Sequence, residues 1–220
     1  MKKGNVLLSV VAVVTITVFL VTFSLNLVVR SSSVYAFYFN DSSVVSTLYV
    51  DITNGDFAKG ISGFFNSWMP DEFQIYEDTG YDLQGVFDEE DSDCMMIIKK
   101  IVDISLLACV LSLIATVAIY WFMIRNGEKR KLRIAFNTAF GIGLVYTIVE
   151  VAVLLSNRGR DWLLSVIGLP TLPEDSKLLV VLGHEFLPTG VVFLIIYTVI
   201  IFLVAFYANY RLTKPPRIFY

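Results

Sequence analysis

The sequence predicts an all-α membrane protein, a four-transmembrane-helix bundle with a small mixed α+β extracytoplasmic cap. Of its 220 residues, 56% are hydrophobic, and these are concentrated in four long runs. A run of about 20 apolar residues is long enough for a helix to cross a bilayer. In lipid a helix satisfies its own backbone hydrogen bonds, whereas an isolated strand does not. The third observation is that most basic residues lie in short segments that the predicted helices would place on one side of the membrane.

The four predicted transmembrane helices cover residues 5–29, 101–124, 134–155 and 191–210. The first run is much longer than the apolar core of about 7–15 residues in a signal peptide. We therefore expect it to stay in the mature chain as a membrane anchor. The second and third runs each contain one acid, Asp103 and Glu150.

Basic residues give the predicted orientation. Ten of the 17 Lys and Arg residues lie in three short segments, namely the N-terminus, the loop 125–133 and the tail 211–220. Such segments usually face the cytoplasm. We therefore expect a multi-pass protein of the bacterial plasma membrane with both termini cytoplasmic. Orientation and contact with anionic lipid explain these charges, so we expect no nucleic-acid partner.

Residues 30–100 form the predicted extracytoplasmic cap. The stretch SVYAFYFNDSSVVSTLYVDI, residues 33–52, alternates aromatic and small residues in a way that weakly favours a strand. The segment that follows predicts an amphipathic helix from Asn54, and the next predicts a hairpin around residues 78–80. The side chains expected on one side of the helix are Phe57, Ile61, Phe64, Phe65 and Trp68.

The second extracytoplasmic segment spans residues 156–190. Its stretch DWLLSVIGL, residues 161–169, is too short to cross a membrane and too apolar for a free loop. We expect it to form a re-entrant or interfacial piece.

An acidic collar precedes the second run, with five carboxylates in the six positions from Asp88 to Asp93. Asp91 or Ser92 could cap a helix that begins near Asp93, and solvation would account for the other acids. A cation site and the rim of an active site are the alternatives. The spacing of an EF-hand calcium loop is absent, and we expect no metal and no cofactor.

His184 is the only histidine in the chain. A single histidine does not provide the three or four ligands of a usual zinc site. It could act as a general base that Glu185, Glu174 or Asp175 orients, or it could be an interfacial residue beside a helix start.

Two further side chains are chemical candidates. Cys94 lies near a helix N-terminus, which favours the thiolate, but the neighbouring carboxylates disfavour it. Glu150 lies inside the third run, where an ionisable group is a functional hypothesis; it could instead pair with Arg158 or Arg160. A transport role for Glu150 has thin support, because no pair of broken helices is evident.

Two stretches carry a family resemblance. FFNSWMPDEFQIYEDTGYDLQGVFDEEDSDCMMIIKKIVD, residues 64–103, and LPEDSKLLVVLGHEFLPTG, residues 172–190, resemble the bacterial lipoprotein intramolecular transacylase family. The resemblance extends over nearly the whole chain. It implies acyl transfer from the glyceryl lipid of a lipoprotein to its N-terminal amine, at the outer side of the membrane.

The resemblance also implies two histidines as an acid–base pair. The first position falls on Cys94, beside a matching Met95, and the aspartate of the motif falls on Ile97. The second position falls near Trp162, where no histidine occurs. The chain therefore looks like a divergent member, in which the chemistry is either rebuilt or lost.

The sequence thus predicts an acyltransferase-like membrane protein whose partners are membrane lipids and lipoproteins. The alternative is a non-enzymatic protein that binds a lipid or partner through its cap. The candidate catalytic residues are His184, Glu185 and Cys94. The candidate substrate-binding residues are Asp91, Asp93, Trp162 and Glu150.

Overall fold

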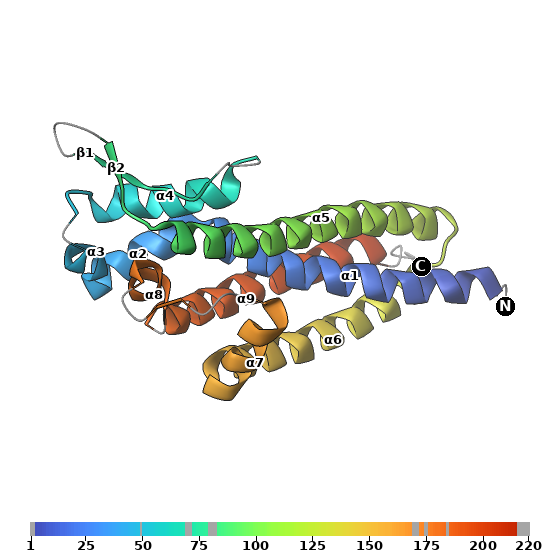
Figure 1. The fold of residues 1–220 in the computed structure, drawn as a ribbon. Helices are drawn as coiled ribbons and strands as arrows, with labels where there is room; N and C mark the ends of the chain where they lie inside the picture. Colours follow the sequence, from blue (N-terminus) through green and yellow to red (C-terminus); the bar gives the residue numbers. More distant parts are fainter. Residues whose placement is uncertain are drawn as a thin grey trace. The chain divides into compact units, whose positions relative to one another are not determined.

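A computed structural model describes most of the chain and is almost entirely helical. The described residues are 3–48, 50–68, 72–78, 83–168, 172–173, 176–183 and 185–214. Four of the helices are long and apolar enough to cross a membrane: α1 (Lys3–Arg30), α5 (Glu89–Arg125), α6 (Lys129–Leu155) and α9 (Phe186–Thr213). These helices and one small sheet confirm the predicted fold class, a multi-pass membrane protein with a mixed α+β part (Figure 1).

The chain divides into two compact units. The bundle unit contains the residues up to Leu25, Ser105–Glu150 and those from Ile195 on. The aromatic unit contains Asn26–Ile104 and Val151–Leu194. Each long helix therefore contributes residues to both units.

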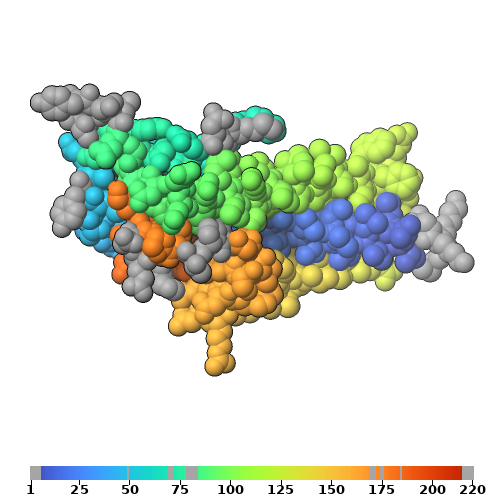
Figure 2. Space-filling model, viewed as in Figure 1, coloured from blue at the N-terminus to red at the C-terminus, as the bar shows by residue number. Residues whose placement is uncertain are grey.

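The bundle unit consists of membrane-helix segments packed through apolar side chains. Ile16 and Leu20 of α1 share a buried cluster with Met123 of α5, Phe136 of α6 and Phe202 of α9. Figure 2 shows α1 and the C-terminal half of α5 side by side. Many apolar side chains remain exposed on these helices, as expected for surfaces in contact with lipid.

The aromatic unit begins where α1 ends. Its short helices are α2 (Ser32–Ser42), α3 (Val44–Thr47), α4 (Asn54–Asn66), α7 (Asn157–Ile167) and α8 (Lys177–Leu182). Helices α2 and α4 lie side by side (Figure 1). Strands β1 (Tyr76–Asp78) and β2 (Leu83–Gly85) pair antiparallel, with Tyr76 opposite Gly85. This pairing confirms the predicted hairpin, whose turn at residues 79–82 lies outside the described residues.

The strand predicted over residues 33–52 is wrong, because this segment forms α2 and α3. Val34, Tyr35, Tyr38 and Phe39 are buried on one face of α2. Their spacing of one, four and five residues is that of a helix face. The alternation of aromatic and small residues led to the wrong prediction, because the spacings typical of a helix and of a strand overlap in so short a segment.

Helix α4 confirms the predicted amphipathic helix and begins at Asn54 as expected. Thr53 is its N-cap, and its side chain accepts a hydrogen bond from the amide of Asp56. Phe57, Ile61 and Phe65 are buried, but Trp68 is 87% exposed. The prediction was wrong for Trp68, because the helix ends at Asn66 and the helical spacing stops there.

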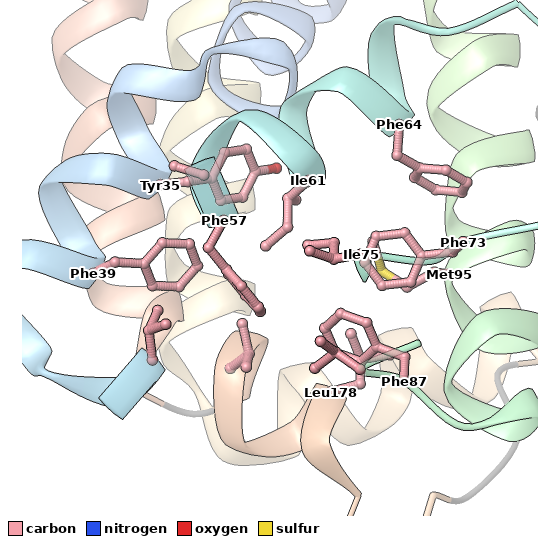
Figure 3. Close-up of a cluster of buried hydrophobic side chains, with 14 of the residues drawn as sticks. Tyr35, Phe39, Phe57, Ile61, Phe64, Phe73, Ile75, Phe87, Met95 and Leu178 are labelled. Atoms are coloured by element: carbon pink, nitrogen blue, oxygen red, sulfur yellow. The ribbon is translucent and has the colours of Figure 1, made fainter. Parts of the chain in front are cut away.

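Aromatic rings fill the core of the aromatic unit (Figure 3). Phe57 of α4 contacts Phe39 of α2 edge-on, with 5.3 Å between ring centroids. The ring centroid of Phe73 lies 4.7 Å from that of Phe87 and 4.8 Å from that of Phe64. Offset and edge-to-face pairs of this kind add stability beyond the burial of their area. This core holds the start of α5, where the acidic collar lies.

Candidate functional site

The acidic collar lies on the first turns of α5. The helix begins at Glu89, earlier than the predicted start near Asp93. Asp91 is therefore inside the helix and is buried, with 2% of its surface exposed. Its carboxylate accepts a hydrogen bond from Ser176 Oγ at 2.5 Å and another from the amide of Leu178 at 3.3 Å. Asp91 thus caps α8, and not the helix of the prediction.

The N-terminus of α8 is held at three points. Ser176 is the N-cap, and its side chain accepts from the amide of Leu179. Lys177 donates to the backbone carbonyl of Val86 at 2.8 Å, and Asp91 supplies the third contact. Ser92, the neighbour of Asp91, accepts from the amide of Phe73. The buried part of the collar therefore joins α5 to α8 and to the chain before β1.

A pocket of about 380 Å³ lies beside this junction. It is lined by Asp88, Glu89, Glu90, Asp91, Pro173 and Ser176. The first three carboxylates are exposed, as is Asp93. Among the described residues, no three His, Cys, Asp or Glu side chains are arranged to hold a metal ion. The pocket therefore presents solvated carboxylates rather than a coordination site.

Cys94 lies in the aromatic core, with 4% of its surface exposed. Met95, the next residue, is fully buried in the same cluster (Figure 3). The thiol is a free cysteine. In this packing it faces apolar side chains and does not reach the pocket that the exposed carboxylates line.

A buried charged network lies two turns further along α5. Lys99 is 3% exposed, and its ammonium donates to the carbonyl of Ser67 at 3.0 Å and contacts Asp103 at 3.1 Å. Arg30 forms an ion pair with Asp103 at 2.6 Å and donates to the carbonyl of Phe65. Phe65 lies in the last turn of α4 and Ser67 is its C-cap, at the helix end where the dipole favours cations. The network therefore fixes the C-terminus of α4.

The sequence analysis missed this network. One signal was present, because Lys99 and Asp103 are four residues apart on a helix and such pairs face each other. The contribution of Arg30 had no local signal, since it is 73 residues from Asp103.

Glu185 is an exposed candidate near Tyr38. Burial raises the pKa of Tyr38, a hydrogen bond with Ser42 lowers it, and the charge of Glu185 raises it further. The ring of Tyr38 contacts Phe186 at 5.3 Å. His184, Glu174 and Asp175 lie outside the described residues. Trp162 is 60% exposed on α7, which has no buried residue.

Glu150 belongs to the bundle unit and lies near the end of α6. It is half-buried, and the described residues of its own unit form no ion pair with it.

Comparison with known proteins gives one informative result. No protein-family model and no curated protein matches the sequence. Among solved structures, the membrane integral lipoprotein intramolecular transacylase Lit from Bacillus cereus superposes with a TM-score of 0.74. The match covers 97% of this chain and 98% of Lit. This chain has a fold similar to that of Lit.

The likeness to Lit confirms, at the level of fold, the resemblance that the sequence motifs indicated. Only 11% of the residues are identical. At that identity the likeness shows the fold alone, and function depends on the site itself. What this chain could do at its own site therefore has to be argued from its own residues.

Proposed function

We propose that this protein binds a lipid or a lipid-modified polypeptide at the extracytoplasmic face of the plasma membrane. On this proposal it uses the fold of an acyl-transfer enzyme without any catalytic role for position 94. The sorting of basic residues supports the orientation, which places the aromatic unit outside and both termini in the cytoplasm. The likeness to Lit supports a lipid or lipoprotein as the ligand.

The burial of Cys94 is the observation that carries the proposal. A general base has to come within hydrogen-bond reach, about 3 Å, of the proton that it removes. Cys94 is enclosed by the aromatic core, and both oxygens of its neighbour Asp91 already accept hydrogen bonds from the start of α8. In this packing the thiol of Cys94 is not exposed to a substrate amine.

The exposed surface of the aromatic unit suits binding. The collar offers exposed carboxylates at Asp88, Glu89 and Glu90, which are complementary to an amine. Helix α7 exposes Trp162 and Val166, one turn apart, which are complementary to lipid. Tryptophan is favoured at membrane–water interfaces because its ring is apolar and its N–H is polar.

A second candidate is acyl transfer at a rebuilt site, and the hydroxyls of Tyr38 and Ser42 favour it. Both hydroxyls are buried, and among the described residues each has only the other as a hydrogen-bond partner, which is unusual for buried polar groups. Glu185 lies close enough to Tyr38 to affect its pKa. In this reaction the substrate amine would attack the ester carbonyl, and the glyceryl oxygen would leave. A base, with His184 as the candidate, would move the amine proton to that oxygen.

Photocrosslinking tests the binding proposal. A photoreactive amino acid replaces Glu90 or Trp162, and the protein is reconstituted in nanodiscs with a purified diacylated lipoprotein. The matched control carries the same group at Leu203, which is 64% exposed in the bundle unit. We expect crosslinks from positions 90 and 162 to the lipidated protein and none to its unlipidated Cys→Ser form. Crosslinking no stronger than from position 203 would contradict the proposal.

A further inference from the structure

An apolar groove lies within the bundle unit, away from the acidic collar in sequence. Its volume is about 400 Å³. It is lined by Ile16, Phe19, Leu20, Thr116, Val117, Tyr120, Trp121, Ile124, Phe136, Ala205, Ala208, Asn209 and Leu212. Nearly all of these side chains are apolar. A groove of this kind between membrane helices suits a hydrocarbon chain.

Two polar side chains of the lining bind each other, and the buried hydroxyl of Thr116, also in the lining, has no hydrogen-bond partner among the described residues. The hydroxyl of Tyr120 donates to Oδ1 of Asn209 at 3.0 Å. Asn209 itself is 4% exposed. The groove therefore offers little to a polar ligand, whereas an acyl chain from the bilayer would pack against its apolar side chains.

Two arginines lie in the last turns of helices that line the groove. Arg125 is in the last turn of α5, and its guanidinium lies 5.2 Å from the ring centre of Trp121, a lining residue. Arg211 is in the last turn of α9, directly before the lining residue Leu212. Both are exposed. A headgroup attached to a chain in the groove would meet these two cations.

The charge of the whole bundle unit points to an anionic headgroup. The acids of this unit are Glu128 and Glu150, and Glu128 already pairs with Lys131 at 2.9 Å. Arg133 is engaged too, because it donates to the backbone carbonyl of Thr213 at 2.7 Å. Arg125 and Arg211 therefore lie in a strongly positive region, and basic residues at helix ends attract anionic lipids.

We propose that this groove binds one acyl chain of an anionic phospholipid, with the lipid phosphate held by Arg125 and Arg211. The site goes beyond the proposed function, because it lies in the bundle unit and requires no lipoprotein. Each arginine near an anionic lipid surface contributes about 1 kcal/mol to the free energy of lipid binding, which corresponds to about fivefold in affinity. We therefore expect at least a fivefold preference for an anionic over a zwitterionic lipid.

Trp121 provides a direct probe, since it lines the groove. The W68F/W162F protein retains Trp121 alone and is reconstituted in phosphatidylcholine vesicles. A small fraction of acyl-brominated phosphatidylglycerol or acyl-brominated phosphatidylcholine is then added as quencher. We expect brominated phosphatidylglycerol to quench about fivefold more effectively per lipid. Equal quenching by the two lipids would overturn the proposal.

Substituted variants distinguish a specific lipid-binding site from general electrostatic attraction between basic residues and anionic lipids. Ala208→Phe fills the groove, and Leu203→Phe is its control on an exposed position of the same helix outside the lining. The double variant R125Q/R211Q removes the two cations. Its matched control, K129Q/R130Q, removes two other basic residues, at the start of α6. We expect A208F and R125Q/R211Q to abolish the preference and the controls to keep it. Equal loss in the controls, or no loss in A208F, would overturn the site.

Discussion

Lys99 shows what a single buried cation does in this fold. Its ammonium lies within hydrogen-bond reach of Phe65 O, Ser67 O and Asp103, and it faces the ring of Phe64. Replacing Lys99 with Met keeps the length of the side chain but leaves the Ser67 carbonyl without this donor. An unsatisfied buried group costs about 1–3 kcal/mol. We predict that K99M lowers the free energy of unfolding by about 2–3 kcal/mol.

The measurement is thermal or denaturant unfolding of the protein in a mild detergent. Lys100→Met is the matched control, because Lys100 is the next residue and is exposed. A surface change of this kind is usually worth less than about 0.5 kcal/mol. Equal unfolding midpoints for the two variants would show that the network does not hold α4.

Asp91 gives a second prediction at this scale. Asp91→Ala removes the acceptor of Ser176 Oγ and of the Leu178 amide, so α8 loses a cap from outside the helix. We expect hydrogen exchange of the α8 amides to accelerate by one to two orders of magnitude, about 1.5–3 kcal/mol of local stability.

Asp93→Ala is the matched control for Asp91, since Asp93 is exposed two residues further along the same helix. It should leave α8 exchange unchanged. Slow exchange of α8 in D91A would mean that Ser176 alone is a sufficient cap.

The role of Asp91 was not predictable from the sequence. Capping was one of the roles predicted for Asp91, besides substrate binding, but the predicted cap was on its own helix and not on α8. Asp91 and Ser176 are 85 residues apart, and only tertiary packing brings them together. The burial of Cys94 had the same cause, because the aromatic core that encloses it comes from several separate segments.

At the scale of elements, α2 was missed and α4 was found, and the difference is physical. Two sequence features indicate helix α4: the N-cap residue Thr53 and buried aromatic residues at helical spacing. The N-cap residue of α2, Ser31, makes no side-chain capping bond, so its start signal was weaker. The hairpin was found because β1 and β2 are joined by a short turn segment, so that their pairing is local.

The first turn of α4 yields a pH prediction. Hydrogen bonds from Thr53 and Lys59 hold the pKa of Asp56 below its ordinary value of 3.8. Because the folded pKa lies below the unfolded one, this stabilisation is present above the ordinary pKa. It is lost as the pH falls through the lowered pKa.

Carbon NMR titration of the Asp56 carboxyl measures this shift. We expect a midpoint below 3.8. Thr53→Val should raise the midpoint, while Thr47→Val, in α3, should not. A midpoint at the ordinary value in the unsubstituted protein would contradict the capping geometry.

The packing of α6 against α9 depends on a glycine. A Cβ atom at Gly143 would lie 2.9 Å from Cζ of Phe202, whose ring is 3% exposed. Overpacking of this kind typically costs about 1–3 kcal/mol. We predict that G143A lowers the unfolding midpoint in detergent. Gly141→Ala, which meets nothing within 4 Å, should leave it unchanged or raise it; equal effects would exclude close packing as the cause.

For the whole molecule, the sequence predicted the membrane helices well. A membrane-spanning helix requires a long run of apolar residues, and such a run can be recognised in one segment of the sequence. A run such as residues 6–25 needs no partner to identify it as a membrane helix. The site was harder to predict, since its residues are defined by contacts between distant segments. The family motif placed a catalytic position at Cys94, yet a motif does not report whether the side chain there is accessible.

This chain has a fold similar to that of Lit and a buried residue, Cys94, at the position where the family resemblance implied a catalytic group. A protein of this kind should hold a lipid or a lipidated chain without transferring an acyl group through Cys94. If chemistry persists, it should depend on Tyr38 and Glu185, and therefore be lost in Y38F or E185Q but retained in C94A.

Mass spectrometry of a lipoprotein's N-terminal lipopeptide tests this account most directly. The host lacks any transacylase and produces the unsubstituted protein, C94A or E185Q, with the presence of each in the membrane verified. We predict that the acyl pattern stays the same as in the host alone. Movement of one acyl chain from the glyceryl group to the amine, lost in C94A, would contradict the account. The same movement retained in C94A but lost in E185Q would establish the rebuilt site.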